Sequence, residues 1–402
     1  MPTLLFVGLG SGRTKRYLVA DLLAAGHDLV LAADTLPDWA RPLAAHTHEV
    51  PLGADDAVEK LVALGHAHAV AGVFTCDEAH VELAAAVARR LGLPALSRAS
   101  ARLCRDKHAM RQRLAEVGVP GAASVLASTL PEALAAADRI GYPVVLKPRN
   151  LGGSVGVVRA DDPDTVRRVF SLTSAADMAR MRPLAGVLVE EYLDGPEISV
   201  ESVAAGGVTT VCAVTEKELG FPPYFEETGH ITRRIRPDDR AVVEVVLAVH
   251  EALDIGWAVT HCELRLTPTG PRVVEIGARP AGDRIPQLVR LATGIDLVAA
   301  GADAALGRRV RPEPTADRVA GVRLIYTPHD GVVTRLAGDT GDLLVDFGWL
   351  ASVGQRVALP PRGFLSRLAY LVAVGDTREA VARDLTQAQA LLDIAVTPER
   401  AR

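Results

Sequence analysis

The strongest constraint on the fold is an alternation of apolar, strand-like runs with helical segments over residues 1–97. The apolar runs of strand length are Thr3–Val7, Asp28–Ala33 and Ala69–Phe74. Apolar residues have helical spacing over Arg16–Ala25 and Glu78–Leu91, and a glycine after each segment favours a helix end there. Apolar strands joined by helices form a parallel sheet that is covered on both faces. The sequence therefore predicts an open, doubly wound α/β domain.

A glycine-rich turn, Gly8–Gly12, follows the first of these runs. Its spacing is not the GxGxxG of dinucleotide-binding turns, and a lone glycine turn is common in other proteins. A tight strand-to-helix turn is therefore the favoured interpretation, and a nicotinamide or flavin site is the weaker alternative.

Composition and charge exclude several classes of protein. The chain has 402 residues, of which 49% are hydrophobic, so it can form two to four domains with buried cores. A net charge of −5 gives no electrostatic reason to bind nucleic acid or an anionic membrane surface. The first apolar run has no basic leader, and no apolar stretch of about 18 residues is free of charge. We therefore expect neither a signal peptide nor a membrane span, and a cytoplasmic location.

The cysteines give no sign of a disulfide framework or a zinc site. None of the four belongs to a CxxC pair, so reduced and buried thiols are expected. His261, Cys262 and Glu263 are neighbours, but successive residues of a strand face opposite sides, so these three cannot share one ion.

Beyond Ala101 the pattern changes to a mixture of strands and helices. The expected strands are Tyr142–Lys147, Gly186–Tyr192, Ile198–Val203, Val208–Val214, His261–Leu266 and Arg272–Ile276. Phe221–Ile231 is rich in proline, aromatic and acidic residues and is expected to be a loop, whereas Asp238–Leu253 has the spacing of an amphipathic helix. After Arg311 several short strands are expected, and a helix over Thr377–Leu392 is expected to close the chain.

Two lysines and a glycine-rich loop form the first candidate site. Lys107 lies early in a predicted helix, and Lys147 ends a strand shortly before the segment GGSVG, which contains Gly153 and Ser154. Glycines let backbone N–H groups turn towards phosphate oxygens, and the serine adds a hydroxyl donor. Two ammonium groups supply the point charges that a triphosphate requires. No GK[ST] follows, so the segment is not a Walker A loop.

Acidic residues follow at the end of the next predicted strand. Glu190 and Glu197 flank Tyr192 and Leu193 in the segment EEYLDGPE. Carboxylates are poor partners for phosphate but good acceptors for an adenine amino group and for ribose hydroxyls. This segment is therefore a candidate for the nucleoside end of ATP.

Glu263 and Glu275 lie on the two strands of a predicted hairpin, which can place their carboxylates on one face. Two buried like charges are costly unless a cation lies between them, and Mg²⁺ bound to ATP phosphates is such a cation. Arg279 follows closely, and its guanidinium can stabilise a developing acyl phosphate or bind a substrate carboxylate.

Taken in order, Lys107, Lys147, GGSVG, EEYLDGPE, HCEL and VVEIGARPAGD resemble the motifs of the ATP-grasp superfamily of carboxylate–amine ligases. The resemblance extends over roughly residues 65–310, and the tail after it resembles the C-terminal domain of the L-amino-acid ligase and biotin-carboxylase-like branches. It implies an α/β domain over 1–97, an ATP-grasp domain over 98–310 and a small α+β domain over 311–402. Within the ATP-grasp domain, a small lobe is expected over about 107–190 and a large lobe over about 191–310.

The resemblance also implies roles for single residues. The residues expected to contact ATP are Lys107, Lys147, Gly153, Ser154, Glu190, Tyr192, Leu193 and Glu197. The expected ligands of Mg²⁺, with Mn²⁺ as the alternative ion, are Glu263 and Glu275. Gly277 stands where many family members have an asparagine that binds metal, so full binding of a second ion is left open.

The segment PPYFEETGHI resembles the loop that L-amino-acid ligases place over their substrates. By that resemblance Glu227 pairs with a substrate ammonium group. His230 either hydrogen-bonds the acyl phosphate or helps to deprotonate the incoming amine. Arg279 and Lys147 complete the expected catalytic set, and Asp283 favours a cationic group on a substrate. The expected reaction joins a carboxylate, such as that of an amino acid, to an amine through an acyl phosphate, with release of ADP and phosphate.

Two alternatives stay open. One is a carboxylase- or formyl-type ATP-grasp enzyme that uses bicarbonate or formate. The other is a non-catalytic nucleotide-binding regulator, to which Gly277 gives some weight. The expected partners are a small-molecule carboxylate and an amine, which the sequence does not name. A homodimer is the default assembly, because dimers are the commonest homo-oligomers.

Overall fold

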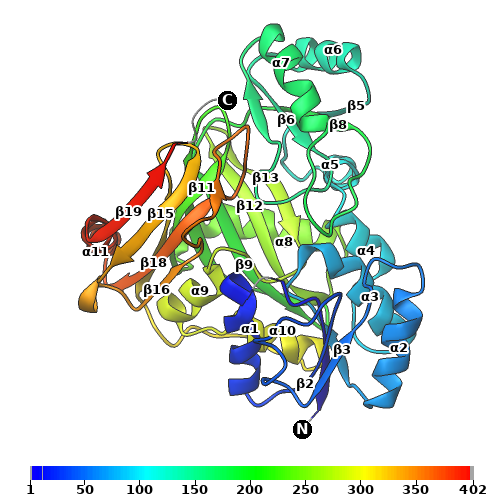
Figure 1. Ribbon diagram of the computed structural model, residues 1–402. Helices are drawn as coiled ribbons and strands as arrows, with labels where there is room; N and C mark the ends of the chain where they lie inside the picture. The colour runs from blue at the N-terminus through cyan, green and yellow to red at the C-terminus, as the bar shows by residue number, and fades with distance from the viewer. Residues whose placement is uncertain (1, 11, 399–402) are drawn as a thin grey trace.

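A computed structural model describes residues 2–10 and 12–398 as three lobes that meet at one large sheet (Figure 1). The mixed α/β and α+β fold class predicted from the sequence is confirmed. No helix in these two stretches is long and apolar enough to cross a membrane.

The N-terminal lobe is the predicted parallel α/β sheet, with strand order β3-β2-β1-β4. Its elements are β1 (Thr3–Val7), α1 (Gly12–Ala24), β2 (Asp28–Ala33), β3 (His46–Glu49), α2 (Ala57–Ala67), β4 (Gly72–Phe74), a 3₁₀ turn η1 (Glu78–His80), α3 (Val81–Arg90) and α4 (Arg98–Leu103). The predicted bounds of β1 and β2 are confirmed. Strand β3 was not predicted, because its sequence HTHE is polar and only partly buried at the sheet edge. The predicted turn over Gly8–Gly12 includes Ser11, which lies outside the described residues.

The small lobe is an antiparallel sheet of order β5-β8-β6-β7, covered on one face by α6 and α7 (Figure 1, top). Its elements are α5 (Lys107–Glu116), β5 (Ser124–Ala127), α6 (Leu130–Ile140), β6 (Val144–Pro148), β7 (Val158–Ala160), α7 (Pro163–Ser174) and β8 (Val187–Glu191). Alanines of α6 and valines of α7 and of the strands form its core, so both helices can approach the short strands closely.

The third lobe is built on an eight-stranded sheet of order β13-β12-β9-β10-β11-β14-β18-β16. Its strands are β9 (Glu197–Ala205), β10 (Val208–Gly220), β11 (Glu226–Arg234), β12 (Trp257–Thr267), β13 (Gly270–Gly277), β14 (Val319–Tyr326), β16 (Asp346–Trp349) and β18 (Arg367–Gly375). A separate sheet of order β17-β15-β19 contains β15 (Gly331–Gly338), β17 (Arg356–Val357) and β19 (Leu392–Thr397). The helices are η2 (Pro237–Asp239), α8 (Arg240–Ala252), α9 (Ile285–Thr293), α10 (Leu297–Ala305), η3 (Gly341–Leu343) and α11 (Arg378–Ala390).

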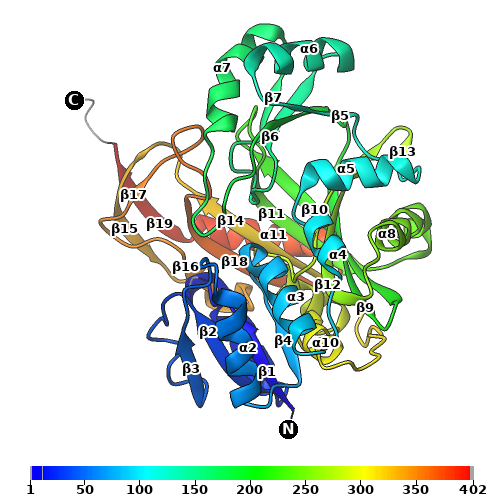
Figure 2. The same cartoon turned by 90° about the vertical axis from the view of Figure 1, so that its right-hand side faces the viewer.

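Helices cover both faces of the large sheet (Figures 1 and 2). Helices α8 and α11 pack on one face, and α9 and α10 pack on the other. Strand pairing runs without a break from β11 to β14, so the expected domain boundary at residue 311 falls inside one continuous sheet. The proposed domain limits stay a prediction.

Two expectations about the chain path were wrong. The expected loop over Phe221–Ile231 contains most of strand β11, which pairs with β10 on one side and β14 on the other. The prolines of this segment end at Pro223, and the pairing with β10 and β14 overrides the polar composition and Gly229 in the remainder. Helix α11 does not close the chain either, since strand β19 follows it.

Asp106 fixes the start of helix α5 and hence the position of Lys107. Its carboxylate accepts hydrogen bonds from the backbone N–H groups of His108 and Ala109 at 3.2 and 3.3 Å. It also forms a bidentate ion pair with Arg149, which follows β6, at 2.7 and 2.6 Å. One buried side chain therefore joins the helix to the strand that bears Lys147.

Replacing Asp106 with Ala is expected to lower the free energy of unfolding by about 2–4 kcal/mol, because a helix cap and a charged hydrogen-bond pair are lost together. Asp106→Asn keeps a capping oxygen and should cost less. The matched control is Asp162→Ala at the N-terminus of α7, where an exposed cap accepts a hydrogen bond from the backbone N–H of Thr165 and the loss should be clearly smaller. Urea denaturation compares the variants, and an equal loss for Asp106→Ala and Asp162→Ala would contradict the linking role.

Candidate active site

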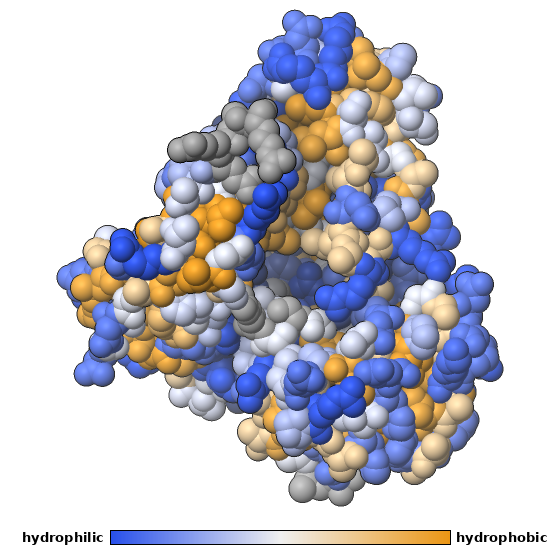
Figure 3. Space-filling model, viewed as in Figure 1, coloured by the Kyte–Doolittle hydropathy of each residue, from blue (hydrophilic) through white to orange (hydrophobic). Residues whose placement is uncertain are grey.

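A cavity between the small lobe and the large sheet collects the predicted nucleotide and metal residues. Figure 3 shows a hollow where the lobes meet, with hydrophilic residues at its floor. The predicted residues that line this cavity are Lys107, Lys147, Gly153, Ser154, Glu190, Tyr192, Leu193, Glu197, Glu227, Glu263 and Glu275. The strand register puts the acids of the large sheet on the same face as helices α9 and α10. They lie on a part of that face that the two helices do not cover.

Lys147 and Glu190 form the wall of the cavity on the small lobe. They lie on the paired strands β6 and β8, and Lys147 Nζ is 2.6 Å from Glu190 Oε2. Arg111 approaches the same carboxylate with Nε at 2.9 Å and Nη2 at 3.1 Å. Burial alone would raise the pKa of Glu190, but Arg111 and Lys147 outweigh it and bring the pKa to about 2. Glu190 is therefore the counter-ion of two buried cations, and its expected contact with adenine stays a prediction.

The GGSVG segment forms an open loop above these strands. Gly153 and Ser154 both have a left-handed backbone, with φ of 62° and 56°. A serine in this region is uncommon and marks a constrained turn. Lys107 Nζ donates a hydrogen bond to the carbonyl oxygen of Leu151 at 2.6 Å and so holds the start of the loop. A side chain at Gly153 would approach Leu365 of the C-terminal region to 3.1 Å, so the loop and that region lie against each other.

Glu263 and Glu275 are direct cross-strand partners in the β12–β13 hairpin, as expected. Each carboxylate has a lysine: Glu275 is 3.0 Å from Lys107 Nζ, and Glu263 contacts Lys217 Nζ. His261 Nε2 lies 3.0 Å from Glu263 Oε1, the same oxygen that Lys217 contacts. Burial would raise the pKa of Glu263, but Lys217 and His261 hold it well below its usual range.

The carboxylates of this site fit a hard divalent cation. Oxygens of Glu197, Glu227 and Glu263 lie within 4.8 Å of one another, and Glu275 faces Glu263 across the hairpin. Carboxylate oxygens are the ligands that Mg²⁺ and Mn²⁺ accept. The residues present therefore suit the expected metal.

Lys217 is the central residue that the sequence analysis missed. Its side chain is almost fully buried, and Nζ is 2.6 Å from Glu227 and 3.5 Å from Glu197, besides its contact with Glu263. The sequence showed little sign of a buried Lys217, because the predicted strand ended at Val214. Strand β10 continues to Gly220 and therefore includes this lysine. Successive residues of a strand face opposite sides, so a longer predicted strand would have placed Lys217 on the opposite face from Glu216 and Glu218, towards the interior.

Two arginines that the sequence analysis also missed contact the residues expected at the nucleoside end, Tyr192 and Glu197. The guanidinium of Arg159 stacks over the ring of Tyr192 at 4.3 Å from its centroid. Arg265 holds Glu197 with Nε at 2.8 Å from the carboxylate, and Leu193 is buried beside them. Burial raises the pKa of Glu197 in spite of Lys217.

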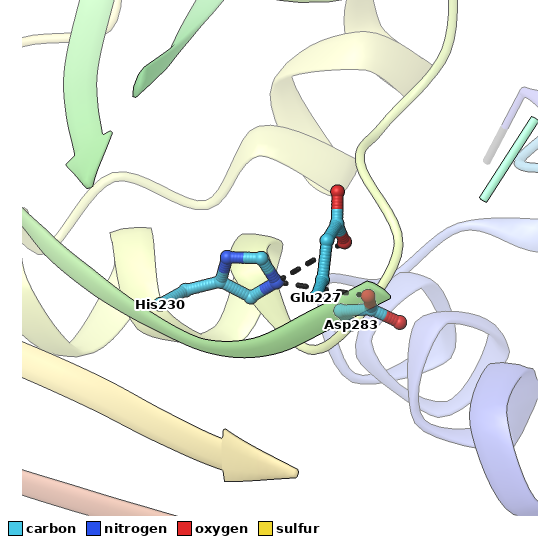
Figure 4. A group of neighbouring side chains, drawn as sticks. All are labelled: Glu227, His230 and Asp283. Atoms are coloured by element: carbon cyan, nitrogen blue, oxygen red, sulfur yellow. Dashed lines mark ion pairs between the residues drawn. The ribbon is translucent and has the colours of Figure 1, made fainter. Parts of the chain in front are cut away.

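A second cluster contains Glu227, His230 and Asp283 (Figure 4). His230 lies on β11 and is fully buried, with Nε2 3.4 Å from Glu227 Oε2 and 3.6 Å from Asp283 Oδ2. Among the described residues, neither ring nitrogen has a partner in hydrogen-bond geometry. Burial would lower the pKa of His230, but Asp283 and Glu227 outweigh it and raise the pKa. Arg367 of β18 pairs with Asp283, so the C-terminal region completes this cluster.

Arg279, which was expected to stabilise an acyl phosphate or bind a substrate carboxylate, forms an ion pair with the N-terminal lobe. Its Nε donates to Glu78 of the N-terminal lobe at 2.8 Å, and Glu78 also binds Arg105 at 2.6 Å. Burial would raise the pKa of Glu78, but these two arginines bring it to about 2. Arg279 thus joins the large sheet to the N-terminal lobe, and its catalytic role stays a prediction.

A second cavity of about 330 Å³ lies beside the cluster, between the N-terminal lobe and the third lobe with its C-terminal strands. It is lined by charged and aromatic groups, among them Lys15, Asp283, Arg284, Arg367 and Tyr370, and by leucines of the C-terminal region. The guanidinium of Arg284 stacks on Tyr370 at 3.9 Å from the ring centroid, which fixes one wall. The cavity can accept a small molecule that carries both charged and apolar groups.

Comparisons with known proteins agree with this geometry. Residues 140–287 match the model of the ATP-grasp domain family. Phosphoribosylamine–glycine ligase of Leifsonia xyli is 31% identical over 76% of this chain and 75% of its own length. Alanine–anticapsin ligase of Bacillus subtilis is 28% identical over 70% of this chain, which spans only 63% of that relative.

A solved structure supports the fold over the whole length of the chain. L-amino acid ligase from Bacillus licheniformis superposes with a TM-score of 0.82 at 23% identity and covers 99% of both chains. The resemblance inferred from Lys107, Lys147 and the motifs after them is thereby confirmed at the level of the family. The chain belongs to the ATP-grasp family of ligases.

Proposed function

We propose that the protein activates a carboxylate with ATP as an acyl phosphate and joins it to an amine, with an amino acid as the carboxylate substrate. The observation that carries the proposal is that opposed Glu263 and Glu275 share one cavity with Lys107, Lys147 and the glycine-rich loop. Glu227 of the acid–histidine cluster lines the same cavity, and that cluster suits an amino acid. Both relatives named above are ligases, and their names specify alanine and glycine.

Lys107 and Lys147 would bind the phosphates, and the backbone of Gly153 and Ser154 would cover them. Both lysines already have carboxylate partners, Glu275 and Glu190, so the cationic wall is positioned before ATP arrives. Such fixed charges stabilise a developing phosphoryl transition state without having to reorganise.

Glu263 and Glu275 would hold Mg²⁺ or Mn²⁺, with Glu197 and Glu227 nearby. When bound, the ion would neutralise the charge of the phosphates and orient them. Lys217 would then be the residue that keeps the remaining acids neutralised, since it contacts Glu227 and Glu197 as well.

Glu227 and Asp283 would receive the ammonium group of an amino acid, in the cavity beside Arg367. Because these carboxylates raise the pKa of His230, the imidazole is more readily protonated than usual. A protonated ring donates hydrogen bonds and cannot accept a proton. This favours the role of His230 as a donor to the acyl phosphate over its role as a base.

The proposal is tested by measuring phosphate and ADP release with ATP and Mg²⁺ over a matrix of paired amino acids and other amines. Release that requires two substrates, together with an amide of matching mass, would support the ligase. Release that depends on bicarbonate or formate would replace it with the carboxylase- or formyl-type alternative. Tight ATP binding with no release in any combination would favour the regulator.

Replacing Glu275 with Gln is expected to lower ATP turnover at least about 100-fold, because a metal ligand contributes several kcal/mol of charge stabilisation. The fold should be retained, since the hairpin pairing is made by the backbone. The matched control is Glu251→Gln, an exposed position on α8 of the same lobe, which should leave turnover unchanged. Steady-state phosphate release measures both, and an active Glu275→Gln variant would remove the metal role.

Glu190→Gln is expected to lower stability at neutral pH by about 3 kcal/mol, since Arg111 and Lys147 lose their buried counter-ion. The folded pKa of Glu190 is about 2, against an ordinary value of 4.5. A depressed carboxyl pKa stabilises the folded state fully above pH 4.5, and this contribution is lost as the pH falls towards 2.

Urea midpoints of wild type and Glu190→Gln should therefore differ most above pH 4.5 and converge below it. Glu251→Gln, the exposed α8 substitution used above, controls for the general effect of removing one negative charge. A difference between wild type and Glu190→Gln that does not change with pH would contradict the ion pair as its source.

A further inference from the structure

A cavity in the N-terminal lobe belongs to neither site described above. Its volume is about 260 Å³, and Gly8, Gly10, Asp34, His80 and Arg180 are among its lining residues. It lies at the carboxyl ends of β1 and β2. The sheet order β3-β2-β1-β4 places β2 and β4 on opposite sides of β1, which makes this the point where the winding of the sheet reverses. Ligands of open α/β sheets bind in the crevice at such points.

His80 gives the cavity an unsatisfied polar atom. The residue is 5% exposed, and among the described residues its Nε2 has no hydrogen-bond partner. The ring is fixed against the turn, since a methyl group at Gly8 would lie 2.3 Å from its Cδ2. Burial lowers the pKa of His80, so the ring is neutral at pH 7 and offers one donor and one acceptor. A buried polar atom without a partner is costly unless a ligand or water satisfies it.

Asp34 and Arg180 supply charges of opposite sign at the rim. Asp34 Oδ1 accepts a hydrogen bond from the backbone N–H of Leu52 at 2.8 Å, which orients the carboxylate. Arg180 comes from the segment between α7 and β8 of the small lobe and reaches Asp77 of the N-terminal lobe at 3.4 Å. Thr35, which carries a hydroxyl group, also lines the cavity. A carboxylate, a neutral imidazole and a hydroxyl suit ligand hydroxyl groups, and the guanidinium suits one anionic group.

We propose that this cavity binds a small polyhydroxylated anion, either a sugar phosphate or a sugar acid. Hydroxyl groups of the ligand bond to Asp34 and His80, and its anionic group bonds to Arg180. The cavity volume of about 260 Å³ suits a ligand of this size.

The site stands apart from the nucleotide cavity but is connected to it by one short element. The turn η1 bears His80 at its end and Glu78 at its start, and Glu78 holds Arg279 beside the large sheet. Arg180 belongs to the small lobe, so a ligand in this cavity bridges that lobe and the N-terminal sheet. The proposal does not depend on which substrates the ligase joins.

Calorimetric titration of the full chain with ribose 5-phosphate, ribose, inorganic phosphate and gluconate tests the site. Ribose 5-phosphate or gluconate should bind at least tenfold more tightly than ribose or phosphate alone, and the tighter of the two identifies the anionic group. Saturating ATP should not displace the ligand. Arg180→Gln and Asp34→Asn should each weaken binding at least tenfold, and Asn at position 34 keeps an oxygen for the N–H of Leu52.

The matched control is Arg182→Gln, which removes an equal charge two residues away, where the guanidinium donates to the carbonyl oxygen of Gly53 instead of lining the cavity. This variant should bind like wild type. The proposal is overturned if neither anion binds at millimolar concentration, or if ATP displaces the bound anion. It is also overturned if Arg180→Gln and Asp34→Asn bind as Arg182→Gln does.

Discussion

One buried ammonium group organises the centre of the active site. Lys217 Nζ contacts carboxylates from three strands of the large sheet, those of Glu197, Glu227 and Glu263. Burying so many charges is favourable only if each one has a partner, since an isolated ion in a protein interior costs several kcal/mol. The pKa of Lys217 is accordingly raised well above its usual value, because the three acids outweigh the effect of burial. Without this residue the three acids would repel one another in a buried environment.

The same pairing of charges recurs around the site, and it links the lobes. Glu190 balances Arg111 and Lys147 within the small lobe, Glu275 balances Lys107 across the lobe boundary, and Glu78 ties the N-terminal lobe to Arg279. The site is thus close to electrical balance before any ligand binds. Binding of a nucleotide and its metal would exchange one set of ionic partners for another, which costs less than opening a site of unpaired charges.

Sequence reasoning found the parts of the site that depend on local pattern. Lys147 at the end of an apolar strand, the glycine-rich loop after it, and acids inside the apolar strands of the β12–β13 hairpin are all unusual enough to be noticed. It missed Lys217, Arg265 and Arg367, because a lysine or arginine in a strand is ordinarily solvated and only the tertiary fold buries it. For the same reason β11 was expected to be a loop, since its polar side chains face a buried charged cluster rather than water.

The continuity of the large sheet has a consequence for the integrity of the chain. Strand β14, from the last third of the sequence, pairs with β11 along most of its length, and β18 covers β14 in turn. Removing the residues after Arg311 would leave the N–H and C=O groups of β11 unpaired along one side, and exposed edges of this kind recruit other chains into aggregates. The C-terminal region therefore covers the edge of the sheet at β11, and it also supplies Arg367. A chain shortened from this end would therefore be prone to aggregate, besides losing Arg367.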